Sequence, residues 1–555
     1  HLKFDILLSF KNALSLYGPE VTEAWGHTGF FTYLKLKIGS DPQNFQKKMD
    51  DLVDAQCAGM METYKLRVLL PLQPLKDIHL TSHYMQEYEA NGSRESVNIL
   101  LIVAFIIIVM AWVNYTNLST ARSLIRAKEV GLRKVVGASR SQLVFQFFFE
   151  TVLLNGIALV LALILFQIAL PVFLKITGLP FPSHIWGQAW FWSLILGLFF
   201  IGVIFSGFYP VTVLTAFNPA KVLKGNLGRA AKGLNLRRIL VIFQFIFALT
   251  LITATLSIYR QVATMKNRDL GFDRERILVV QSPRVRGELF KDNFETFKNE
   301  ILKDTLVQKI CAVTEVPGRQ IYWDAGGIRK AGESAALGKN YQIVGVDFDF
   351  VDVFNLKILL GRNFSREFPS DAKALLLNET AVHWMGFKNA EEAVGHQVDY
   401  WGEFFTIIGV LADYHQQSPK NSMEPHLYRF MPYGRGPRGK FAMKIAPEET
   451  NRTINRIEDR YMSMFPGNPF EYFFLDDYFN QQYRADELFG KVIGLFAFLA
   501  IFVTGMGIFG MSSYMAVQRT REIGNRKTLG ATTGLIFRMM FKDFLVLIGI
   551  SVVVA

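Results

Sequence analysis

Cysteine is nearly absent from this chain of 555 residues, which contains only Cys57 and Cys311. The two lie far apart in different polar stretches, so no disulfide framework is indicated. Charged residues are also scarce at 19%, below the roughly 25% of ordinary soluble domains. A phosphate-binding loop is missing as well: GRAAKGLN has its two glycines suitably spaced, but Leu234 and Asn235 occupy the places of the required lysine and hydroxyl residue. Any ATP hydrolysis must therefore come from another chain.

Long apolar runs are abundant instead. Half of the residues are hydrophobic, and the run VNILLIVAFIIIVMAWV from Val97 contains no ionisable side chain. About 20 helical residues cross the roughly 30 Å hydrocarbon layer of a bilayer. Similar runs begin near Val144, Ala189, Ile239, Leu488 and Ile536. We therefore predict a multi-pass α-helical membrane protein with six visible crossings.

The net charge of +12 is concentrated in three short loops beside these runs, which argues against nucleic acid as a partner and for contact with membrane lipid. The positive-inside rule makes these loops cytoplasmic. Their basic residues are Arg122, Arg126, Lys128, Arg133, Lys134 and Arg140; Lys221, Lys224, Arg229, Lys232, Arg237 and Arg238; and Arg519, Arg521, Arg526 and Lys527. Alternation of the crossings then places residues 1–93 and 261–487 outside the cytoplasm.

Two of these loops contain nearly the same phrase. RAKEVGLRKVVGAS begins at Arg126 and RTREIGNRKTLGAT begins at Arg519, an offset of 393 residues, and seven of fourteen positions are identical. The identical residues are Arg126, Glu129, Gly131, Arg133, Lys134, Gly137 and Ala138, which coincide with Arg519, Glu522, Gly524, Arg526, Lys527, Gly530 and Ala531. An apolar run precedes and follows each copy, so we predict a tandem duplication of a four-helix membrane module. Two four-helix modules would have eight crossings, and the six visible ones fit this arrangement if the first and the last are missing. We therefore expect the chain to be truncated at both ends.

The phrase predicts a short helix at the membrane surface, a turn and the start of the next crossing. Glu129 and Arg133 are four residues apart in the favourable order, as are Glu522 and Arg526. Gly137 permits the turn, and Ser139 with Gln142 forms a capping-box pattern. In the second copy Thr532 is the candidate cap, but Leu535 replaces the glutamine. Lipid attraction requires positive charge in any order, whereas here glycine, acid and base recur at fixed positions, which favours a shaped protein contact.

The segment 261–487 is predicted to mix strands and helices. Short β-rich runs begin at Arg276, Tyr341, Lys357 and Phe404. A helix that covers the sheet is predicted from the apolar face formed by Ile454, Ile457, Tyr461 and Met464. In the first outer segment, the alternation in FTYLKLKIG from Phe31 predicts one strand.

Four regions follow from these patterns. Residues 1–93 form a first extracytoplasmic domain, truncated at its N-terminus. Residues 94–260 contain the helices of the first module and the first helix of the second, with a cytoplasmic segment at 118–143. Residues 261–487 form the second extracytoplasmic domain, and residues 488–555 contain the remaining helices, with a corresponding cytoplasmic segment at 515–535.

These patterns resemble a known family. NYTNLSTARSLIRAKEVGLRKVVGAS and FGMSSYMAVQRTREIGNRKTLGAT resemble the cytoplasmic coupling segment of the FtsX-like permeases, which include MacB-type permeases of ATP-binding cassette systems. LLLNETAVHWMGF and AVGHQVDYWGEFFTIIGVLADYH resemble the MacB-like periplasmic core domain, and HLKFDILLSF resembles the middle of such a domain. The long duplicated form is similar to permeases of Bacteroidetes-type bacteria.

The resemblance implies that the coupling segments dock on a cytoplasmic ATPase dimer, which would bind ATP and Mg, and that its motion reaches the outer domains. This role is carried to Arg126, Lys128, Glu129, Gly131, Arg133, Lys134, Gly137 and Ala138, and to Arg519, Arg521, Glu522, Gly524, Arg526, Lys527, Gly530 and Ala531. Asn525 stands where the first copy has the aliphatic Leu132. The second segment is therefore expected to bind the ATPase less symmetrically.

No pattern indicates catalysis, a metal or a bound cofactor in this chain. His79 and His83 share no convincing helix, and the nearby acids form no ligand pattern with them. GMGIFG from Gly505 lies inside an apolar crossing, where close helix packing explains the glycines. GRGPRG from Gly434 describes a loop. No spacing supports a nucleophile with a base.

Two hypotheses follow for function. The first is a non-catalytic permease subunit of the bacterial inner membrane, with two large periplasmic domains, that exports or extracts a peptide, hydrophobic compound or lipoprotein. The second is a membrane scaffold that transmits ATPase motion to a periplasmic partner such as a cell-wall hydrolase.

Overall fold

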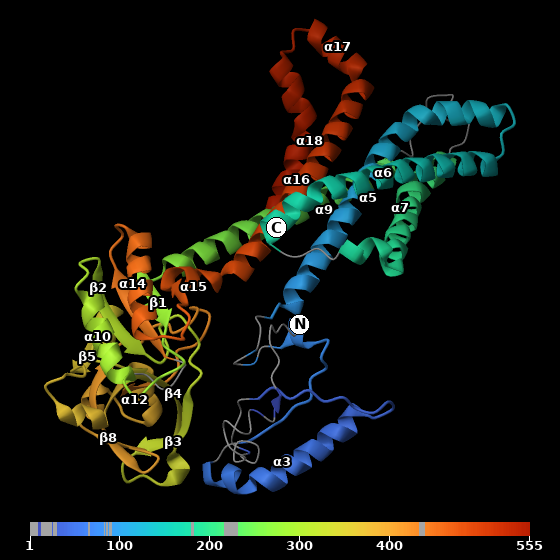
Figure 1. Cartoon of the computed structure of the whole chain (residues 1–555). Helices are drawn as coiled ribbons and strands as arrows, with labels where there is room; N and C mark the ends of the chain where they lie inside the picture. Colours follow the sequence, from blue (N-terminus) through green and yellow to red (C-terminus); the bar gives the residue numbers. More distant parts are fainter. Residues whose placement is uncertain are drawn as a thin grey trace. The chain divides into compact units, whose positions relative to one another are not determined.

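The computed structural model describes residues 9–10, 12, 25, 30–64, 67–82, 84, 87, 91–178, 183–215, 231–431 and 439–555. Side chains are not described for some helical positions, including 120–131, 208–215 and 231–238. The chain divides into two compact units: His1–Arg94 with Thr264–Arg484, and Glu95–Ala263 with Ala485–Ala555. Figure 1 shows that the second unit is helical, whereas the first contains a large sheet. Each unit is described by itself.

The helical unit contains every predicted crossing. Its helices are α5 (Arg94–Val135), α6 (Arg140–Thr177), α7 (Ala189–Thr215), α9 (Ala231–Asn267), α16 (Arg484–Gln518), α17 (Thr520–Thr528) and α18 (Thr533–Val554). Among the described residues, four stretches are long and apolar enough to span a membrane: Arg94–Ser119, Ser141–Thr177, Ile239–Asn267 and Arg484–Ser513. Shorter apolar stretches lie at Ala189–Phe205 and Leu545–Val554. All six predicted runs are thus helical, and the prediction of a multi-pass helical membrane protein is confirmed.

The helices α5, α9 and α16 share a core while their outer faces remain apolar. The buried residues of this core are Val103, Met110, Ala248, Leu251, Ile493, Ala497 and Ala500. Phe105 and Phe498 lie on the same helices with more than half of their surface exposed. Exposed phenylalanines on long apolar helices suit a lipid environment, because lipid chains take the place of a protein core.

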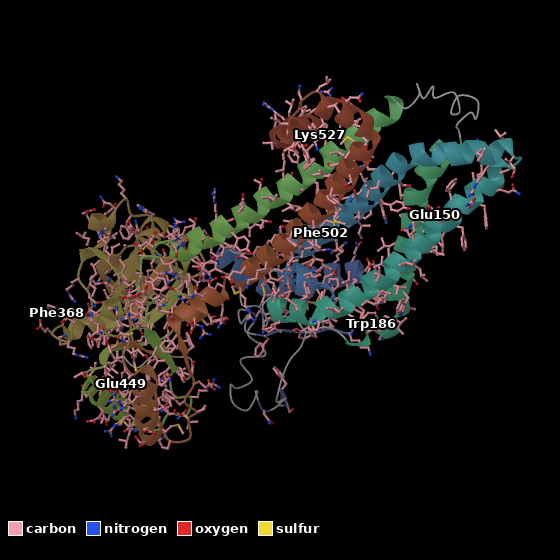
Figure 2. The ribbon with its side chains drawn as sticks, turned by 90° about the horizontal axis from the view of Figure 1, so that it is seen from above. Glu150, Trp186, Phe368, Glu449, Phe502 and Lys527 are labelled. Carbon is pink, nitrogen blue, oxygen red and sulfur yellow. The ribbon has the colours of Figure 1, made fainter. Side chains whose placement is uncertain are left out.

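Aromatic side chains gather where α6 is connected to α7. The connection contains the short helix η1 (Ser183–Gly187), and the Trp192 indole Nε1 donates to the Trp186 carbonyl at 2.8 Å. Phe166 and Phe191 pack against Trp186 with ring centroids 5.9 and 5.5 Å away. Figure 2 labels Trp186 on this helical unit. Tryptophans with one polar end favour the membrane–water interface. Because the loop before α6 is predicted to be cytoplasmic, alternation of the crossings places this connection at the outer surface, where such a belt is expected.

The other unit contains an eleven-stranded sheet within its described residues. Its strands are β1 (Ile277–Gln281), β2 (Val307–Val313), β3 (Asp324–Lys330), β4 (Lys339–Val346), β5 (Ile358–Gly361), β6 (Ala374–Asn378), β7 (Gln397–Tyr400), β8 (Glu403–Leu411), β9 (His426–Phe430), β10 (Lys440–Ile445) and β11 (Tyr472–Phe474). Their order is β11-β1-β10-β2-β4-β3-β7-β8-β6-β9, with β5 beside β8. The strands predicted from Arg276, Tyr341, Lys357 and Phe404 are β1, β4, β5 and β8.

The sheet has two halves with different shapes. In the first half β11, β1, β10 and β2 are covered by α10 (Phe290–Leu302) and α14 (Thr450–Met464), which pack together over one apolar core. The predicted helix is α14, and Ile454, Ile457 and Tyr461 are buried in that core. In the second half β9 also pairs with β4 in parallel, which closes a ring of six strands. The short helices α11 (Phe350–Val353), α12 (Glu379–Met385), α13 (Ala390–Ala393) and α15 (Leu475–Gln481) complete this domain.

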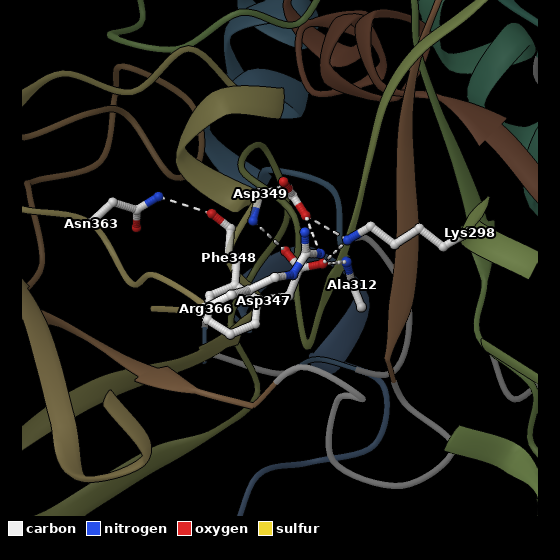
Figure 3. A network of polar contacts seen from close by, with 7 residues as sticks. All are labelled: Lys298, Ala312, Asp347, Phe348, Asp349, Asn363 and Arg366. Atoms are coloured by element: carbon white, nitrogen blue, oxygen red, sulfur yellow. Dashed lines mark hydrogen bonds and ion pairs between the residues drawn. The ribbon is translucent and has the colours of Figure 1, made fainter. Parts of the chain in front are cut away.

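The two halves meet at a narrow junction that contains buried ion pairs. Between β2 and β4 only Val313 and Val346 are paired in register. Next to this pair, the Lys298 ammonium of α10 lies 3.0 Å from Asp347 and 2.5 Å from Asp349 (Figure 3). Asp347 also accepts a hydrogen bond from the Ala312 N–H at 2.9 Å. Burial raises the pKa of Asp347 to about 6, although Lys298 opposes the shift.

A second buried pair lies on the segments that connect the halves. The Lys440 ammonium is 2.7 Å from the Glu315 carboxylate, and both side chains are less than one tenth exposed. Burial lowers the pKa of Lys440, although Glu315 opposes the shift. Two buried charge pairs thus hold the two halves of the sheet in one arrangement, because breaking either pair would leave a buried charge without a counter-ion.

A buried histidine lies at the start of β9. His426 is 1% exposed, and its Nδ1 is 3.4 Å from the Tyr428 hydroxyl. Its Nε2 has no hydrogen-bond partner in the described part of the chain, and His426 is one of the residues that line a cavity of about 20 Å³. Burial lowers the pKa of His426 to about 4, so the ring is neutral at pH 7.

One predicted strand is wrong. Residues 31–37, which include most of the alternating stretch from Phe31, have no regular secondary structure. In the described part of the first outer segment, the regular elements are α3 (Pro42–Tyr64) and α4 (Ile78–Thr81). Alternation alone does not form a strand, because a strand requires a neighbour for its backbone hydrogen bonds.

Candidate functional site

The two copies of the repeated phrase fold into the same local structure. We call residues 132–139 the first elbow and residues 525–532 the second elbow. In the first elbow, α5 ends at Val135 and α6 begins at Arg140; in the second, α17 ends at Thr528 and α18 begins at Thr533. Each elbow therefore joins the end of one helix to the start of the next crossing.

The backbone hydrogen bonds of the two elbows correspond one to one. Three N–H groups donate to carbonyls three, four and five residues earlier in each copy. In the first elbow these bonds are Gly137 to Lys134 (3.2 Å), Val136 to Leu132 (3.0 Å) and Ala138 to Arg133 (2.9 Å). In the second they are Gly530 to Lys527 (3.1 Å), Leu529 to Asn525 (3.2 Å) and Ala531 to Arg526 (3.0 Å). Such bonds satisfy the last carbonyls of a helix that ends in a left-handed residue.

Glycine and a capping residue explain why the chain turns at these points. Gly137 has φ of 105° and Gly530 has φ of 89°, a conformation that side chains disfavour. The N-caps Ser139 and Thr532 both have φ of −71° and ψ of 153°. The predicted capping box is confirmed: Gln142 N donates to Ser139 Oγ at 3.3 Å, and Ser139 N donates to the Gln142 side chain at 3.0 Å.

Each elbow presents an almost fully exposed aliphatic side chain, which the sequence analysis missed. Val136 is 81% exposed, and its counterpart Leu529 is 87% exposed. Both immediately precede the left-handed glycine, so the turn holds them away from either helix. The available signal was that this position is aliphatic in both copies, although it lies outside the apolar runs. An apolar tip surrounded by basic residues is suited to a groove on a partner protein.

Among the charged residues of the elbows, Arg133, Arg526 and Lys527 are exposed and Lys134 is half-buried. The Arg526 guanidinium is 2.8 Å from the Glu522 carboxylate, as the spacing predicts, and both side chains are about half exposed. In the first copy Arg133 donates to the Gln146 side chain at 2.8 Å. The side chains of Arg126, Lys128, Glu129 and Arg521 lie outside the described part, and so does the predicted Glu129–Arg133 pair.

Other predicted features also fall outside the described residues. These are the basic residues Lys221, Lys224 and Arg229, His83, and most of the loop GRGPRG from Gly434. Within the described part, no group of three or more His, Cys, Asp or Glu side chains could hold a metal ion.

The two copies differ just before the elbow. In the first, α5 continues from the membrane to Val135 as one helix of 42 residues. In the second, α16 ends at Gln518 and α17 begins at Thr520, with Arg519 between them at φ of −95° and ψ of 14°. Figure 1 shows the separate α17 at the end of α16. The short surface helix that the sequence predicts is thus separate only in the second copy.

Comparison with known proteins identifies the family of these elements. The model described as FtsX-like permease C-terminal matches residues 101–219 and 494–555, which include both elbows. The model described as MacB-like periplasmic core domain matches residues 239–459, which include most of the sheet. The chain belongs to the FtsX/MacB-type ABC transporter permeases. The domain that contains the large sheet is accordingly the extracytoplasmic α+β domain of this permease.

Individual relatives are distant and longer than the matched part of this permease. It is 26% identical over 198 residues to the macrolide export ATP-binding/permease protein MacB of Campylobacter jejuni. The aligned region covers 35% of this chain and 30% of the relative. It is 22% identical over 213 residues to the protein of the same name from Chromobacterium violaceum, with 37% and 32% covered. The permease thus spans about a third of the length of these curated relatives.

Solved structures similar to this permease are also distant. One is the periplasmic region of MacB from Actinobacillus actinomycetemcomitans, with 16% identity, a TM-score of 0.28 and coverage of 39% of this chain and 96% of the other. Another is the extracellular domain of the noncanonic ABC-type transporter YknZ from Gram-positive bacteria, with 15% identity, a TM-score of 0.25 and coverage of 35% and 97%.

Proposed function

We propose that the two elbows dock on a cytoplasmic ATPase dimer and that the permease transmits the motion of this dimer to its periplasmic domain. The chain would lie in the bacterial inner membrane and move a peptide, hydrophobic compound or lipoprotein. ATP and Mg would bind to the partner, because the sequence contains no phosphate-binding loop.

The observation that carries this proposal is the repetition of one exposed shape. Two elbows with corresponding hydrogen bonds, left-handed glycines and caps present Val136 and Leu529 at equivalent positions. Burying one such side chain in a groove contributes about 1.5–3 kcal/mol, and the surrounding basic residues would steer an acidic partner surface. Anchoring to lipid headgroups requires neither the glycine nor the apolar tip. Two similar docking elements match a partner that is itself a dimer.

The test replaces the apolar tips with charge. In the double variant Val136→Asp and Leu529→Asp, the folded elbows should persist, because both side chains are exposed, but ATPase retained on the purified permease should fall at least tenfold. The matched control is Leu337→Asp, since Leu337 is 53% exposed on the outer domain. Membrane insertion, measured by carbonate extraction, should not change in either variant. Equal ATPase retention in all three proteins would contradict the proposal.

The scaffold hypothesis differs in what the outer domain holds. Copurification of crosslinked material from the periplasmic side distinguishes the two hypotheses. A small molecule, peptide or lipoprotein whose release requires ATP supports transport. A cell-wall hydrolase that becomes active on ATP addition supports the scaffold and contradicts transport.

A further inference from the structure

Equivalent positions of the two modules meet where α5 and α16 cross. The offset of 393 residues relates three pairs spaced by four residues along the two helices: Met110 and Val503, Asn114 and Gly507, and Leu118 and Met511. The first pair belongs to one apolar cluster and the third pair to another. In the middle pair, a Cβ added to Gly507 would lie less than 3.0 Å from the Asn114 side chain. We call these six residues the seam.

The seam has the pattern of a twofold interface. Where two copies of a surface are related by a twofold axis, residues on the axis contact their own equivalents. In the predicted topology both helices run from the outside to the cytoplasm, so they are parallel, and a spacing of four residues forms one ridge on each helix. A local pseudo-twofold axis along the membrane normal would bring these equivalent residues together in this way.

One hydrogen bond across the seam and one from α9 to the seam come from amide side chains inside the membrane unit. Asn114 Nδ2 donates to the Val503 carbonyl of α16 at 3.0 Å, and Asn114 is only 8% exposed. Gln244 of α9, which is 3% exposed, donates through Nε2 to the Met110 carbonyl of α5 at 3.0 Å. Amide hydrogen bonds and small residues are what hold helices together where lipid removes the hydrophobic driving force.

The middle pair makes the seam asymmetric. The first module has asparagine and the second has glycine, and the asparagine amide occupies the space that a side chain at Gly507 would fill. Two α5 helices from different copies of the chain would bring Asn114 against Asn114, in a space that fits one amide. Two α16 helices would bring Gly507 against Gly507, with no donor across the helices. Only α5 with α16 combines one amide with one glycine.

We propose that the two modules of a single chain pair with each other through this seam, and that the asparagine–glycine pair selects this arrangement over pairing with a second copy. One polypeptide then forms both halves of the permease. The proposal does not depend on ATPase binding by the elbows, so it can fail while the proposed function stands, and the reverse also holds.

Cysteine crosslinking tests the pairing directly. Leu118→Cys with Met511→Cys is introduced after Cys57 and Cys311 are replaced by alanine, and two differently tagged copies are expressed together in membranes. We expect oxidation to link the two halves of one chain, so that fragments produced by cleavage within the outer domain stay together. Linked dimers that contain both tags would overturn the proposal.

A matched control uses two other equivalent residues on the same helices. Phe105 and Phe498 are also separated by 393 residues, but they are 56% and 64% exposed on the outer faces. The pair Phe105→Cys with Phe498→Cys should show at least tenfold less linkage within the chain. Equal linkage at the control and seam positions would overturn the proposal, because the seam would then not be a defined contact.

A residue swap tests the selection. In the crosslinking background, Gly507→Asn alone creates two facing amides and Asn114→Gly alone creates two glycines, so each should lower linkage within the chain severalfold. The double variant Asn114→Gly with Gly507→Asn exchanges the two residues across the axis and should restore the linkage. If the double variant is no better than the worse single variant, the pseudo-twofold seam is wrong.

Discussion

Charged residues have different surroundings in the outer domain and in the elbows. In the outer domain, Lys298 and Asp347 are 6% and 2% exposed and face each other across the junction of the sheet. At the second elbow, Arg526 and the preceding Glu522 of α17 are 50% and 42% exposed, and their charged groups lie at a similar distance. Buried pairs are costly to break, whereas exposed pairs contribute little. The outer charges therefore maintain the fold, while the elbow charges remain available to a partner.

The largest expected effect is at the buried pair. Lys298→Met leaves Asp347 buried without its cation, and we expect the outer domain to lose about 3–5 kcal/mol of stability. The measurement is pulse proteolysis of the whole permease in urea, which follows the fragment from the outer domain. Lys303→Met is the control, since Lys303 is 71% exposed. A second control, the double variant Lys298→Met with Asp347→Leu, should recover most of the lost stability. A loss below 1 kcal/mol in Lys298→Met alone would mean that the buried pair of the outer domain contributes no more than the exposed pair at the second elbow.

The next effect is the pH dependence from His426. Its folded pKa of about 4 is below the ordinary value of about 6.5, so the unfolded chain binds a proton first as the pH falls. The stability contribution is complete above about pH 6.5 and is lost as the pH falls through 4, by about 3 kcal/mol. We expect His426→Gln to lack this loss. A constant stability difference between wild type and variant from pH 7 to pH 4 would contradict a buried, neutral histidine.

A smaller effect is expected at the left-handed glycines. A β-branched side chain at Gly137 or Gly530 costs roughly 1–2 kcal/mol in this conformation, so Gly137→Val and Gly530→Val should each loosen one elbow. If the elbows dock on the ATPase as proposed, the amount of ATPase retained on the purified permease should fall about tenfold in each variant. Gly156→Val is the control, because Gly156 lies within α6 with no atom near an added Cβ. Unchanged retention in both elbow variants would mean that the shape of the turn is not recognised.

The caps should give a still smaller and unequal effect. Ser139 makes two reciprocal hydrogen bonds with Gln142, whereas Thr532 accepts one, at 3.4 Å, from Leu535 N. We expect Ser139→Ala to cost about 1 kcal/mol and Thr532→Ala less. Hydrogen exchange of the first-turn amides of α6 and α18 measures both. The converse variant Leu535→Gln should slow hydrogen exchange at α18 by completing a capping box with Thr532. Equal losses of stability in Ser139→Ala and Thr532→Ala would contradict this account.

The exposed pair should give the smallest effect. Glu522→Gln removes the attraction to Arg526 and should cost about 0.3–0.5 kcal/mol of helix stability. Hydrogen exchange of α17 at low and high salt detects it, since salt screens the interaction in the wild type only. A loss above 1 kcal/mol would show that the elbow charges, like those of the outer domain, maintain the fold.

The local features could be predicted because each depends on neighbours in sequence. The membrane helices were predicted from apolar runs long enough to span a bilayer. The cap of α6 was predicted from Ser139 and Gln142, because both hydrogen bonds of the capping box lie within four residues. Four strands of the outer sheet, β1, β4, β5 and β8, were predicted for the same reason, since β-branched runs are a local pattern. The stretch from Phe31 shows the limit, because its alternation lacks a partner strand among the described residues.

Features that depend on distant residues were not predicted. Nothing near Lys298 indicates that its ammonium faces Asp347, since the two groups are brought together only by the junction of β2 and β4. Val136 and Leu529 were missed because an aliphatic residue beside an apolar run suggests burial, and only the turn reveals its exposure. The interruption at Arg519 has no counterpart at Arg126, although the two residues are identical.

That interruption has a mechanical consequence. The 42 residues of α5 form one continuous helix, roughly 60 Å along its path, with no interruption between the first elbow and the far end. In the second copy the helix is interrupted at Arg519, so part of a displacement of the second elbow would be taken up there. Equal displacements of the two elbows would therefore produce unequal movements on the far side of the bilayer.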